Sequence, residues 1–281
     1  MTIGCVDVGG GVRDIYGAGV FDYFMDEGII FDYCIGVSAG SANCASYVAG
    51  QRGRNKHFYL DYLIRKEAIG TAKYLRTGSF VDLNYVYGTL SNEGGENPLD
   101  YLSLTESKTD LTVVATDAKT GDAAYFDKHK DMAQNDYRIL MASSCLPVFC
   151  KPITIKGKQY YDGGLSDPIP YQKAFENGCD KVIIILTKPV DAMLNQNRNA
   201  LGASVLKRKY PQFSKTMKAA SDVYSSQLKE ALQLQEEGKA LILAPDDIMG
   251  LGTLTRDKDK LLKLYEKGYH DAQKIKPFLS L

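Results

Sequence analysis

The chain has 281 residues, of which 44% are hydrophobic and 24% charged, a composition typical of a folded globular protein and not of a disordered one. Its 34 basic residues balance its 34 acidic ones, and this zero net charge argues against a general nucleic-acid binder, which needs a positive field to hold phosphates. Apolar runs are far shorter than the roughly 18 residues of a membrane span, and the first residues lack the pattern of a secretory signal.

The cysteine and histidine content points away from metal chemistry. The six cysteines include no C-x-x-C pair, and the three histidines do not complete a zinc pattern. Because most neighbours of the cysteines are apolar, we interpret them as buried hydrophobic side chains in a reducing compartment. We therefore expect a cytoplasmic protein that needs neither a metal nor a cofactor.

Strand-like and helix-like segments alternate along the chain. Their patterns predict, in order, a strand over 3–8, a helix over 12–24, a strand over 31–37, a helix over 39–49, a strand over 111–116, a hairpin over 153–161, a strand over 182–187, a helix over 211–237, a strand over 241–244 and a helix over 256–274. This alternation predicts an α/β fold with a mostly parallel sheet that is covered on both faces. Since no linker rich in proline, glycine or serine divides the chain, we predict one domain over 1–281. Its motif-bearing core spans about 3–187, and its less assignable part is 190–281.

Residues 9–11 are three glycines between the first predicted strand and the first predicted helix, and Arg13 follows them. Glycines there allow a tight turn that aims backbone N–H groups outward, and the helix N-terminus adds partial positive charge. The loop is typical of a site for a phosphate or an oxyanion; a plain strand-to-helix turn is the alternative. A dinucleotide fingerprint is disfavoured, because Asp14 stands at its third glycine position.

Gly36, Ser38 and Gly40 match the G-x-S-x-G pattern between a predicted strand and a predicted helix. The flanking glycines permit the sharp turn that exposes a nucleophilic Oγ, whereas a tight turn with a capping serine is the alternative. Parallel strands end at the same edge of a sheet, so Ser38 and the glycine loop are expected side by side. A nucleophile beside backbone N–H donors is the arrangement that acyl transfer requires.

The order of these motifs argues against the α/β-hydrolase fold, in which several strands precede the nucleophile and a histidine completes the triad. Here only one strand precedes the strand of Ser38, and the histidines lie in polar segments that predict exposure. Asp162, Gly163 and Gly164 follow the predicted hairpin, and by themselves they indicate only a turn.

Taken together, the three ordered motifs resemble the patatin-like phospholipase family, with the bacterial branch as the nearest match. Further matching stretches are 33–40, 142–147 and 162–170, and the resemblance covers most of 3–187. It implies a three-layer α/β/α sandwich, which agrees with the predicted alternation. It also implies a Ser-Asp dyad that works without a histidine.

Carried onto this chain, the resemblance implies Ser38 as the nucleophile and Asp162 as the base. Gly9, Gly10 and Gly11 would form the oxyanion-hole segment, with the amides of Gly10 and Gly11 as donors and Gly9 allowing the turn. The remaining motif positions are implied in supporting roles: Arg13, which holds the loop, and Gly36, Gly40, Gly163 and Gly164. Asp14 departs from the family's usual glycine and puts the shape of the loop in question. An ordinary carboxylate is a weak base for a hydroxyl, so burial is expected to raise the pKa of Asp162.

The implied substrate is a lipid acyl ester: a phospholipid, a lysophospholipid or a neutral glyceride. From 192 to 221 the chain carries six basic residues, no acidic ones and interleaved apolar side chains, so this segment is a candidate for peripheral contact with an anionic membrane. A solvated lid or helix face is the alternative. Two other functions fit the same fold, namely a catalytically silent lipid-binding regulator and an acyltransferase that replaces water with another acceptor.

Overall fold

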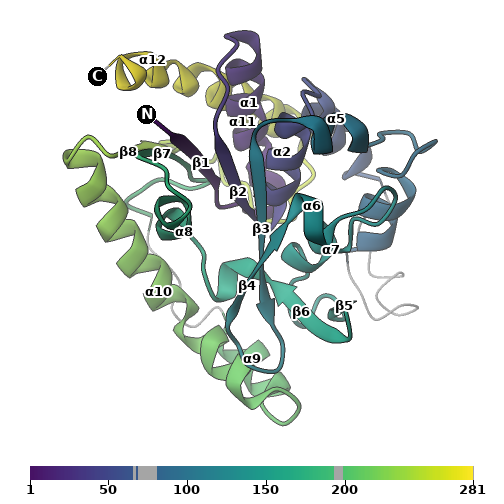
Figure 1. Cartoon of the computed structure of the whole chain (residues 1–281). Helices are drawn as coiled ribbons and strands as arrows, with labels where there is room; N and C mark the ends of the chain where they lie inside the picture. The colour runs from purple at the N-terminus through teal and green to yellow at the C-terminus, as the bar shows by residue number, and fades with distance from the viewer. Residues whose placement is uncertain (66–67, 69–80, 193–198, 281) are drawn as a thin grey trace.

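The computed structural model describes residues 1–65, 68, 81–192 and 199–280 (Figure 1). Within these residues, one sheet contains eight strands. They are β1 (Ile3–Asp7), β2 (Tyr33–Val37), β3 (Asp110–Asp117), β4 (Ala123–Asp127), β5 (Ile153–Ile155), β6 (Lys158–Asp162), β7 (Lys181–Ile185) and β8 (Ala240–Leu243). The path of hydrogen-bonded neighbours is β5-β6-β3-β2-β1-β7-β8, and β4 pairs with the edge of β3 opposite to the one that β6 and β2 share. The five strands from β3 to β8 in this order are parallel, whereas β4, β5 and β6 form antiparallel pairs.

Strands β2 and β6 meet end to end along one edge of β3. Strand β2 pairs with the first part of β3 and ends with Val37 opposite Val114. Strand β6 runs in the other direction and ends with Asp162 opposite Ala115. Strand β4 pairs with both parts of β3 and therefore occupies its other edge. The register of β3 thus brings the end of β6 next to Ser38, the residue that follows β2.

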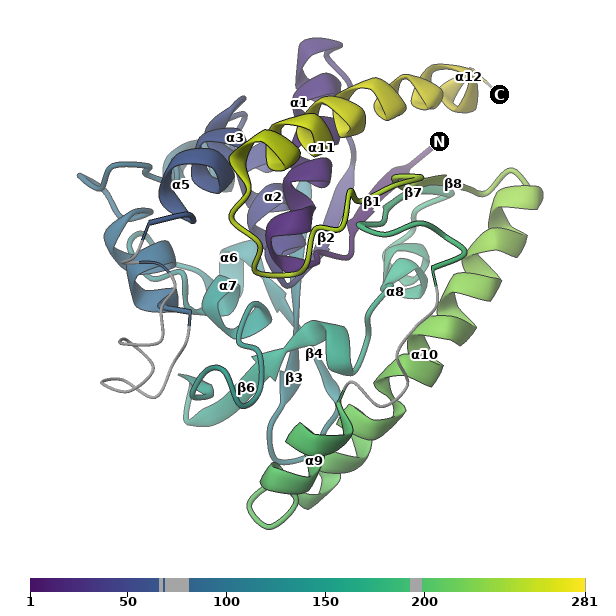
Figure 2. The ribbon, with the colours of Figure 1, turned by 180° about the vertical axis from the view of Figure 1, so that it is seen from behind.

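Helices cover both faces of the sheet (Figures 1 and 2). The α-helices described are α1 (Ile15–Asp26), α2 (Ala39–Val48), α3 (Arg54–His57), α5 (Tyr101–Glu106), α6 (Lys128–Asp131), α7 (Arg138–Ser143), α8 (Tyr171–Glu176), α9 (Ala200–Leu206), α10 (Pro211–Glu236), α11 (Lys258–Asp271) and α12 (Ile275–Leu279). The 3-10 turns are η1 (Gly11–Asp14), η4 (Gly163–Leu165) and η5 (Ala272–Lys274), and the π-helical turns are η2 (Phe58–Tyr62) and η3 (Tyr85–Thr89).

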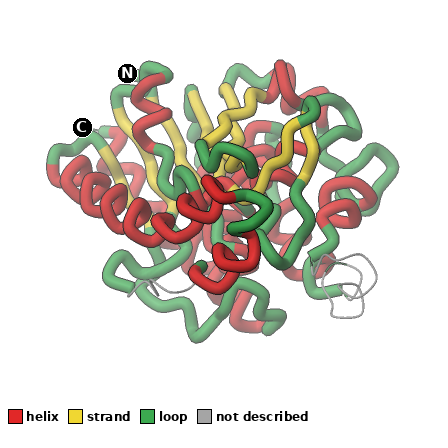
Figure 3. Tube along the Cα trace, turned by 90° about the horizontal axis from the view of Figure 1, so that it is seen from below, coloured by secondary structure: helices red, strands yellow, loops and turns green. Residues whose placement is uncertain are grey.

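Neighbouring residues of β1 show how the layers form. Cys5 packs in a cluster with α1, α2 and α11, whereas Val6 packs in a second cluster with α8 and α10. This follows from the alternation of side chains along a strand, and apolar residues on both faces are typical of a buried parallel sheet. Seen from below, the long helix α10 runs along one side of the strands (Figure 3). The predicted α/β fold with helices on both faces of a mostly parallel sheet is confirmed.

Helices α1 and α11 pack at very short range. A Cβ at Gly19 would overlap the backbone of Tyr265, and a Cβ at Gly268 would overlap the backbone of Tyr16. The Tyr265 hydroxyl donates to Asp22 Oδ2 at 2.7 Å. Two further hydrogen bonds join the same helices. The Tyr16 hydroxyl donates to Asp271 Oδ2 at 2.9 Å, and the Tyr269 hydroxyl donates to Asp26 Oδ2 at 2.9 Å. Close backbone contact and directed hydrogen bonds therefore fix α11 on α1.

The predicted strands and long helices all occur, with ends shifted by a few residues. The sequence analysis missed short helices such as α5, α7 and α8, because six residues are too few to show a helical period. All six cysteines are buried and free, as predicted. Among the described helices, none has the length and apolarity needed to cross a membrane.

Candidate active site

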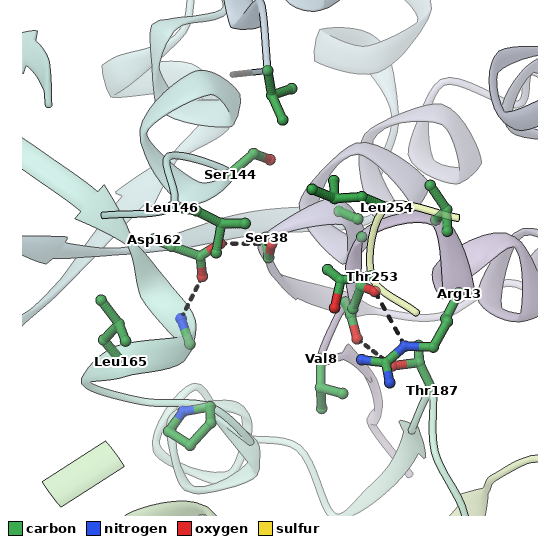
Figure 4. Close-up of a pocket in the computed structure, with 18 of the residues that line it drawn as sticks. Val8, Arg13, Ser38, Ser144, Leu146, Asp162, Leu165, Thr187, Thr253 and Leu254 are labelled. Carbon is green, nitrogen blue, oxygen red and sulfur yellow. Dashed lines mark hydrogen bonds between the residues drawn. The ribbon is translucent and has the colours of Figure 1, made fainter. Parts of the chain in front are cut away.

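Ser38 lies in the sharp turn between β2 and α2, at the centre of the site (Figure 4). Its backbone has φ +56° and ψ −130°, a conformation that side-chain-bearing residues rarely adopt and that surrounding contacts must hold. The Ser38 N–H donates to Ser143 Oγ at 2.8 Å, and the Ser38 carbonyl accepts from Ser41 Oγ at 2.7 Å. The strained turn thus presents Oγ to the cavity, as in a nucleophile elbow.

Asp162 faces Ser38 from the end of β6. The Ser38 hydroxyl donates to Asp162 Oδ2 at 2.7 Å, although 124 positions separate the two residues in the chain. The other carboxylate oxygen, Oδ1, accepts from the Gly164 N–H at 2.9 Å. The Asp162 side chain is only 4% exposed, and the Thr116 hydroxyl anchors the Asp162 carbonyl at 2.8 Å. These contacts orient one carboxylate oxygen toward the serine.

The glycine loop lies directly over the turn of Ser38. Gly9 has φ +67°, and a Cβ there would overlap the carbonyl of Val37. Only glycine therefore allows the loop to lie this close to Val37. The Gly9 N–H donates to Asp7 Oδ1 at 3.1 Å and is thereby engaged. By contrast, the N–H groups of Gly10 and Gly11 donate to no group in the described part of the chain. These two amides are therefore the ones available for an oxyanion.

Three groups hold the glycine loop from outside it. The Thr187 hydroxyl donates to the Gly9 carbonyl at 2.6 Å, and the Thr253 carbonyl accepts from the Val12 N–H at 3.0 Å. Arg13 Nε donates to the Gly10 carbonyl at 3.4 Å. Arg13 therefore lies where the resemblance places it, whereas the sequence analysis missed both threonines. Only the folded chain brings them to the loop.

The other predicted motif glycines permit close packing around the dyad. A Cβ at Gly36 would overlap the backbone of Ser41, and one at Gly40 would overlap Asp7. A Cβ at Gly163 would overlap the carbonyl of Val114, while Gly164 donates to Asp162 as described above. The structure thus brings every predicted motif position to one end of the sheet.

A buried pair of carboxyl groups lies beneath the loop. A Cβ at Gly17 would lie 2.6 Å from Asp14 Oδ1 and 2.8 Å from Asp7 Oδ2, so the two side chains converge at one point. Burial raises the pKa of Asp7 to about 6. Burial and the adjacent charge of Asp7 raise the pKa of Asp14 well above its ordinary value. The interaction between the two side chains lowers the pKa of Asp7 and raises that of Asp14, so the pair favours a proton on Asp14 over one on Asp7.

The sequence analysis missed Asp7, which both receives the Gly9 N–H and accepts from Asn43 Nδ2 at 3.2 Å. A carboxylate at the end of an otherwise apolar strand was the signal that could have identified it. The structure also explains the departure at Asp14. Its side chain is fully buried and lies beside the side chain of Asp7.

The dyad opens into a cavity of about 420 Å³. The apolar side chains in its wall include Phe58, Tyr59, Leu63, Val81, Leu83, Val86, Leu146 and Leu254. The polar side chains in its wall include Arg13, Lys188, Asn199, Ser221 and Tyr224. Figure 4 shows Asp162 and Leu146 on one side of Ser38 and Thr187, Thr253 and Arg13 on the other. The cavity can thus take a molecule with an apolar and a polar part.

The three histidines His57, His129 and His270 are exposed and lie outside the cavity wall, in agreement with the sequence analysis. Within the described part of the chain, no group of three or more His, Cys, Asp or Glu side chains is arranged to hold a metal ion.

This combination of a parallel sheet, a serine elbow, a carboxylate partner and a glycine loop defines a patatin-type α/β protein. A family model described as patatin-like phospholipase matches residues 8–175, and the chain belongs to that family. A second model, described as a domain of unknown function (DUF6363), matches residues 210–279.

Two individual proteins are similar to this chain. The uncharacterized protein YjjU of Escherichia coli K12 is 29% identical over 189 residues, which cover 66% of this chain and 52% of YjjU. The chain therefore matches about half of that relative's length. The crystal structure of VipD from Legionella pneumophila superposes with a TM-score of 0.53 at 14% identity, covering 98% of this chain and 66% of VipD. This likeness supports the fold.

Proposed function

We propose that the protein is a serine acyl hydrolase that cleaves the carboxylic ester of a lipid. The observation that carries the proposal is the 2.7 Å hydrogen bond from Ser38 Oγ to Asp162 Oδ2 beside the unengaged amides of Gly10 and Gly11. This arrangement supplies a nucleophile, a base and oxyanion donors within one site.

In the first half of the reaction, Ser38 Oγ attacks the ester carbonyl carbon while its proton moves to Asp162 Oδ2. The negative charge that develops on the carbonyl oxygen is stabilised by the Gly10 and Gly11 N–H groups and by the N-terminus of α2. The intermediate then collapses, and the alcohol leaves with the proton that Asp162 held. The acyl group remains on Ser38 as an ester.

In the second half, a water molecule gives a proton to Asp162 and attacks the acyl-enzyme carbonyl. The same two amides receive the oxyanion. Collapse releases the fatty acid, and the proton returns from Asp162 to Ser38. The Gly164 N–H keeps Asp162 Oδ1 occupied in both halves, so Oδ2 carries out both proton transfers.

The mixed lining of the cavity supports a lipid as the substrate. Its apolar side chains can bury an acyl chain, and burial stabilises each CH₂ group by about 0.8 kcal/mol. Its polar side chains, which include Arg13 and Lys188, suit the alcohol portion of the ester. Assay of phospholipid, lysophospholipid and diacylglycerol with the same acyl chain would rank these substrates, and we expect each to exceed an acetyl ester in kcat/KM.

The test is reaction of the pure protein with a fluorophosphonate, read by intact mass. We expect one adduct on the wild type, none on Ser38→Ala and much slower labelling of Asp162→Asn. Ser204→Ala and Asp122→Asn, at exposed positions, are the matched controls and should label at the wild-type rate.

Each other outcome has a distinct meaning. An unlabelled but folded wild type would contradict the proposal and favour the silent lipid-binding regulator. A labelled protein that releases no fatty acid, and instead passes the acyl group to an added alcohol, would identify an acyltransferase.

A further inference from the structure

Four exposed apolar side chains lie on two segments that are in contact, α9 and the loop before β5. Val148 is 39% exposed, Phe149 47%, Leu201 79% and Val205 64%. A Cβ at Gly202 would lie 3.2 Å from Val148 Cγ2, so the loop and α9 are in contact. We call these four residues the apolar face.

Helix α9 packs against the core with its partly buried Leu206 but exposes its other large apolar side chains. Its small Ala203 is fully buried, whereas Leu201 and Val205, one helical turn apart, face outward. On the loop, Val148 has φ +71°, a conformation that is strained for a β-branched residue. Both segments thus expose apolar side chains, although folding by itself favours burying them.

The two segments that carry the apolar face contain basic residues and no acidic ones, and one of these basic residues, Lys156, pairs with Asp131 of another segment at 2.6 Å. Residues 143–161 and 199–221 together contain eight basic residues and no acidic ones, in a chain whose net charge is zero. The basic residues are Lys151, Lys156, Lys158, Lys207, Arg208, Lys209, Lys215 and Lys218. Lys207, Arg208 and Lys209 follow α9 directly and are exposed. Arg198, also part of the segment that the sequence analysis singled out, lies outside the described residues.

The apolar face borders the catalytic cavity. Ser144 and Leu146 line the cavity just before Val148 and Phe149 in the chain. On the other segment, Asn199 lines it two residues before Leu201. A membrane or protein surface that binds to the apolar face would therefore lie next to the cavity that leads to Ser38.

We propose that the apolar face and its basic rim dock the protein on the surface of an anionic lipid bilayer, with the cavity facing the membrane. Apolar side chains then enter the headgroup boundary, and the lysines and arginine pair with anionic headgroups. The inference rests on the proposed function in that the membrane supplies the lipid ester.

The test separates docking from catalysis. Docking is measured by sedimentation of the Ser38→Ala protein, which leaves the lipid intact, with vesicles of phosphatidylcholine alone or mixed equally with phosphatidylglycerol. We expect binding to the mixed vesicles at low salt, weaker binding at high salt and little binding to phosphatidylcholine. Phe149→Ser/Leu201→Ser/Val205→Ser and, separately, Lys207→Gln/Arg208→Gln/Lys209→Gln should each weaken binding about tenfold or more.

The matched control is Ile30→Ser/Leu102→Ser, which removes two exposed apolar side chains from outside the apolar face and should not change binding. In the catalytically intact background, both triple variants should hydrolyse a soluble short-chain ester at the wild-type rate. Wild-type hydrolysis without vesicle binding would overturn docking alone, whereas binding without any hydrolysis would overturn the proposed function alone.

Two further results would overturn the docking proposal. One is equal vesicle binding by the triple variants and the control. The other is that the protein forms a dimer which Phe149→Ser/Leu201→Ser/Val205→Ser disrupts without changing vesicle binding. The apolar face would then join two copies of the chain.

Discussion

Residues 8–175 and residues 210–279 contribute to the site in different ways. The first region carries the dyad, the glycine loop and all the recognised motifs. The second contains no residue of the proposed chemistry, but its α11 packs on α1, its Thr253 holds the glycine loop and its α10 lines the cavity. The comparison shows that the residues of the proposed chemistry lie in recognisable sequence motifs, whereas the elements that hold them in place do not.

The sharpest test of this division is Asp162→Asn in the first region. The amide keeps the shape of the side chain but does not accept the serine proton, so we expect kcat/KM to fall about 10³-fold or more without loss of fold. Hydrolysis of a soluble ester and a thermal melt measure the two effects. Exposed Asp122→Asn is the control, and a loss below tenfold for Asp162→Asn would assign the base to another group.

In the second region, Gly268→Ala should act on stability. The added Cβ meets the backbone of Tyr16, so α11 must move away from α1, and we expect the free energy of unfolding to fall by about 1–3 kcal/mol. Denaturant unfolding measures it, with exposed Glu266→Ala on the same helix as control. An unchanged stability would show that α11 is not needed to support α1.

Asp14→Asn tests the buried carboxyl pair through pH. The pKa of Asp14 is raised in the folded state, so folding takes up a proton and wild-type stability falls as pH rises from about 4 through the folded pKa. The amide donates to Asp7 without titrating. We therefore expect the variant to gain stability over the wild type, by on the order of 1 kcal/mol more at pH 8 than at pH 5. Urea unfolding at both pH values, with Asp122→Asn as control, measures the gain. A difference in free energy of unfolding between variant and wild type that is the same at pH 5 and pH 8 would contradict the prediction.

The smallest expected effect is that of Thr187→Val, which removes the hydroxyl that donates to the Gly9 carbonyl. One hydrogen bond of about 0.5–1 kcal/mol corresponds to a loss of about 2- to 5-fold in kcat with little change in KM. Thr187→Ser restores the donor and should recover most of the activity. If Ser were no better than Val, the threonine would act through packing and not through its hydroxyl.

Much of the fold was predictable, because its central strands are short runs rich in apolar and β-branched residues. The strands around 3–8, 31–37 and 182–187 and the turn of Ser38 depend on local sequence, and local patterns identified them. The antiparallel pairing of β6 with β3 was not predictable, since its register depends on two segments that are distant in the sequence. The motifs therefore indicated which residues act together but not how the sheet brings them into contact.

The supporting residues of the site were harder to predict for the same reason. Thr187 and Thr253 are ordinary loop residues in the sequence, and their contacts with the glycine loop exist only in the folded chain. Val148 and Leu201 are also ordinary apolar residues until the structure shows that they face outward. Asp7 is the exception, because a charge in a buried strand is visible in the sequence itself.

The meeting of β2 and β6 on one edge of β3 also bears on the timing of synthesis. Ser38 and Asp162 are 124 positions apart, and Thr253, which holds the glycine loop, is synthesised later still. A ribosome-bound chain that lacks these later residues has Ser38 but neither Asp162 nor a fixed glycine loop. If these residues act as proposed, ester hydrolysis is absent from the nascent chain and begins only after Asp162 and Thr253 have joined the fold.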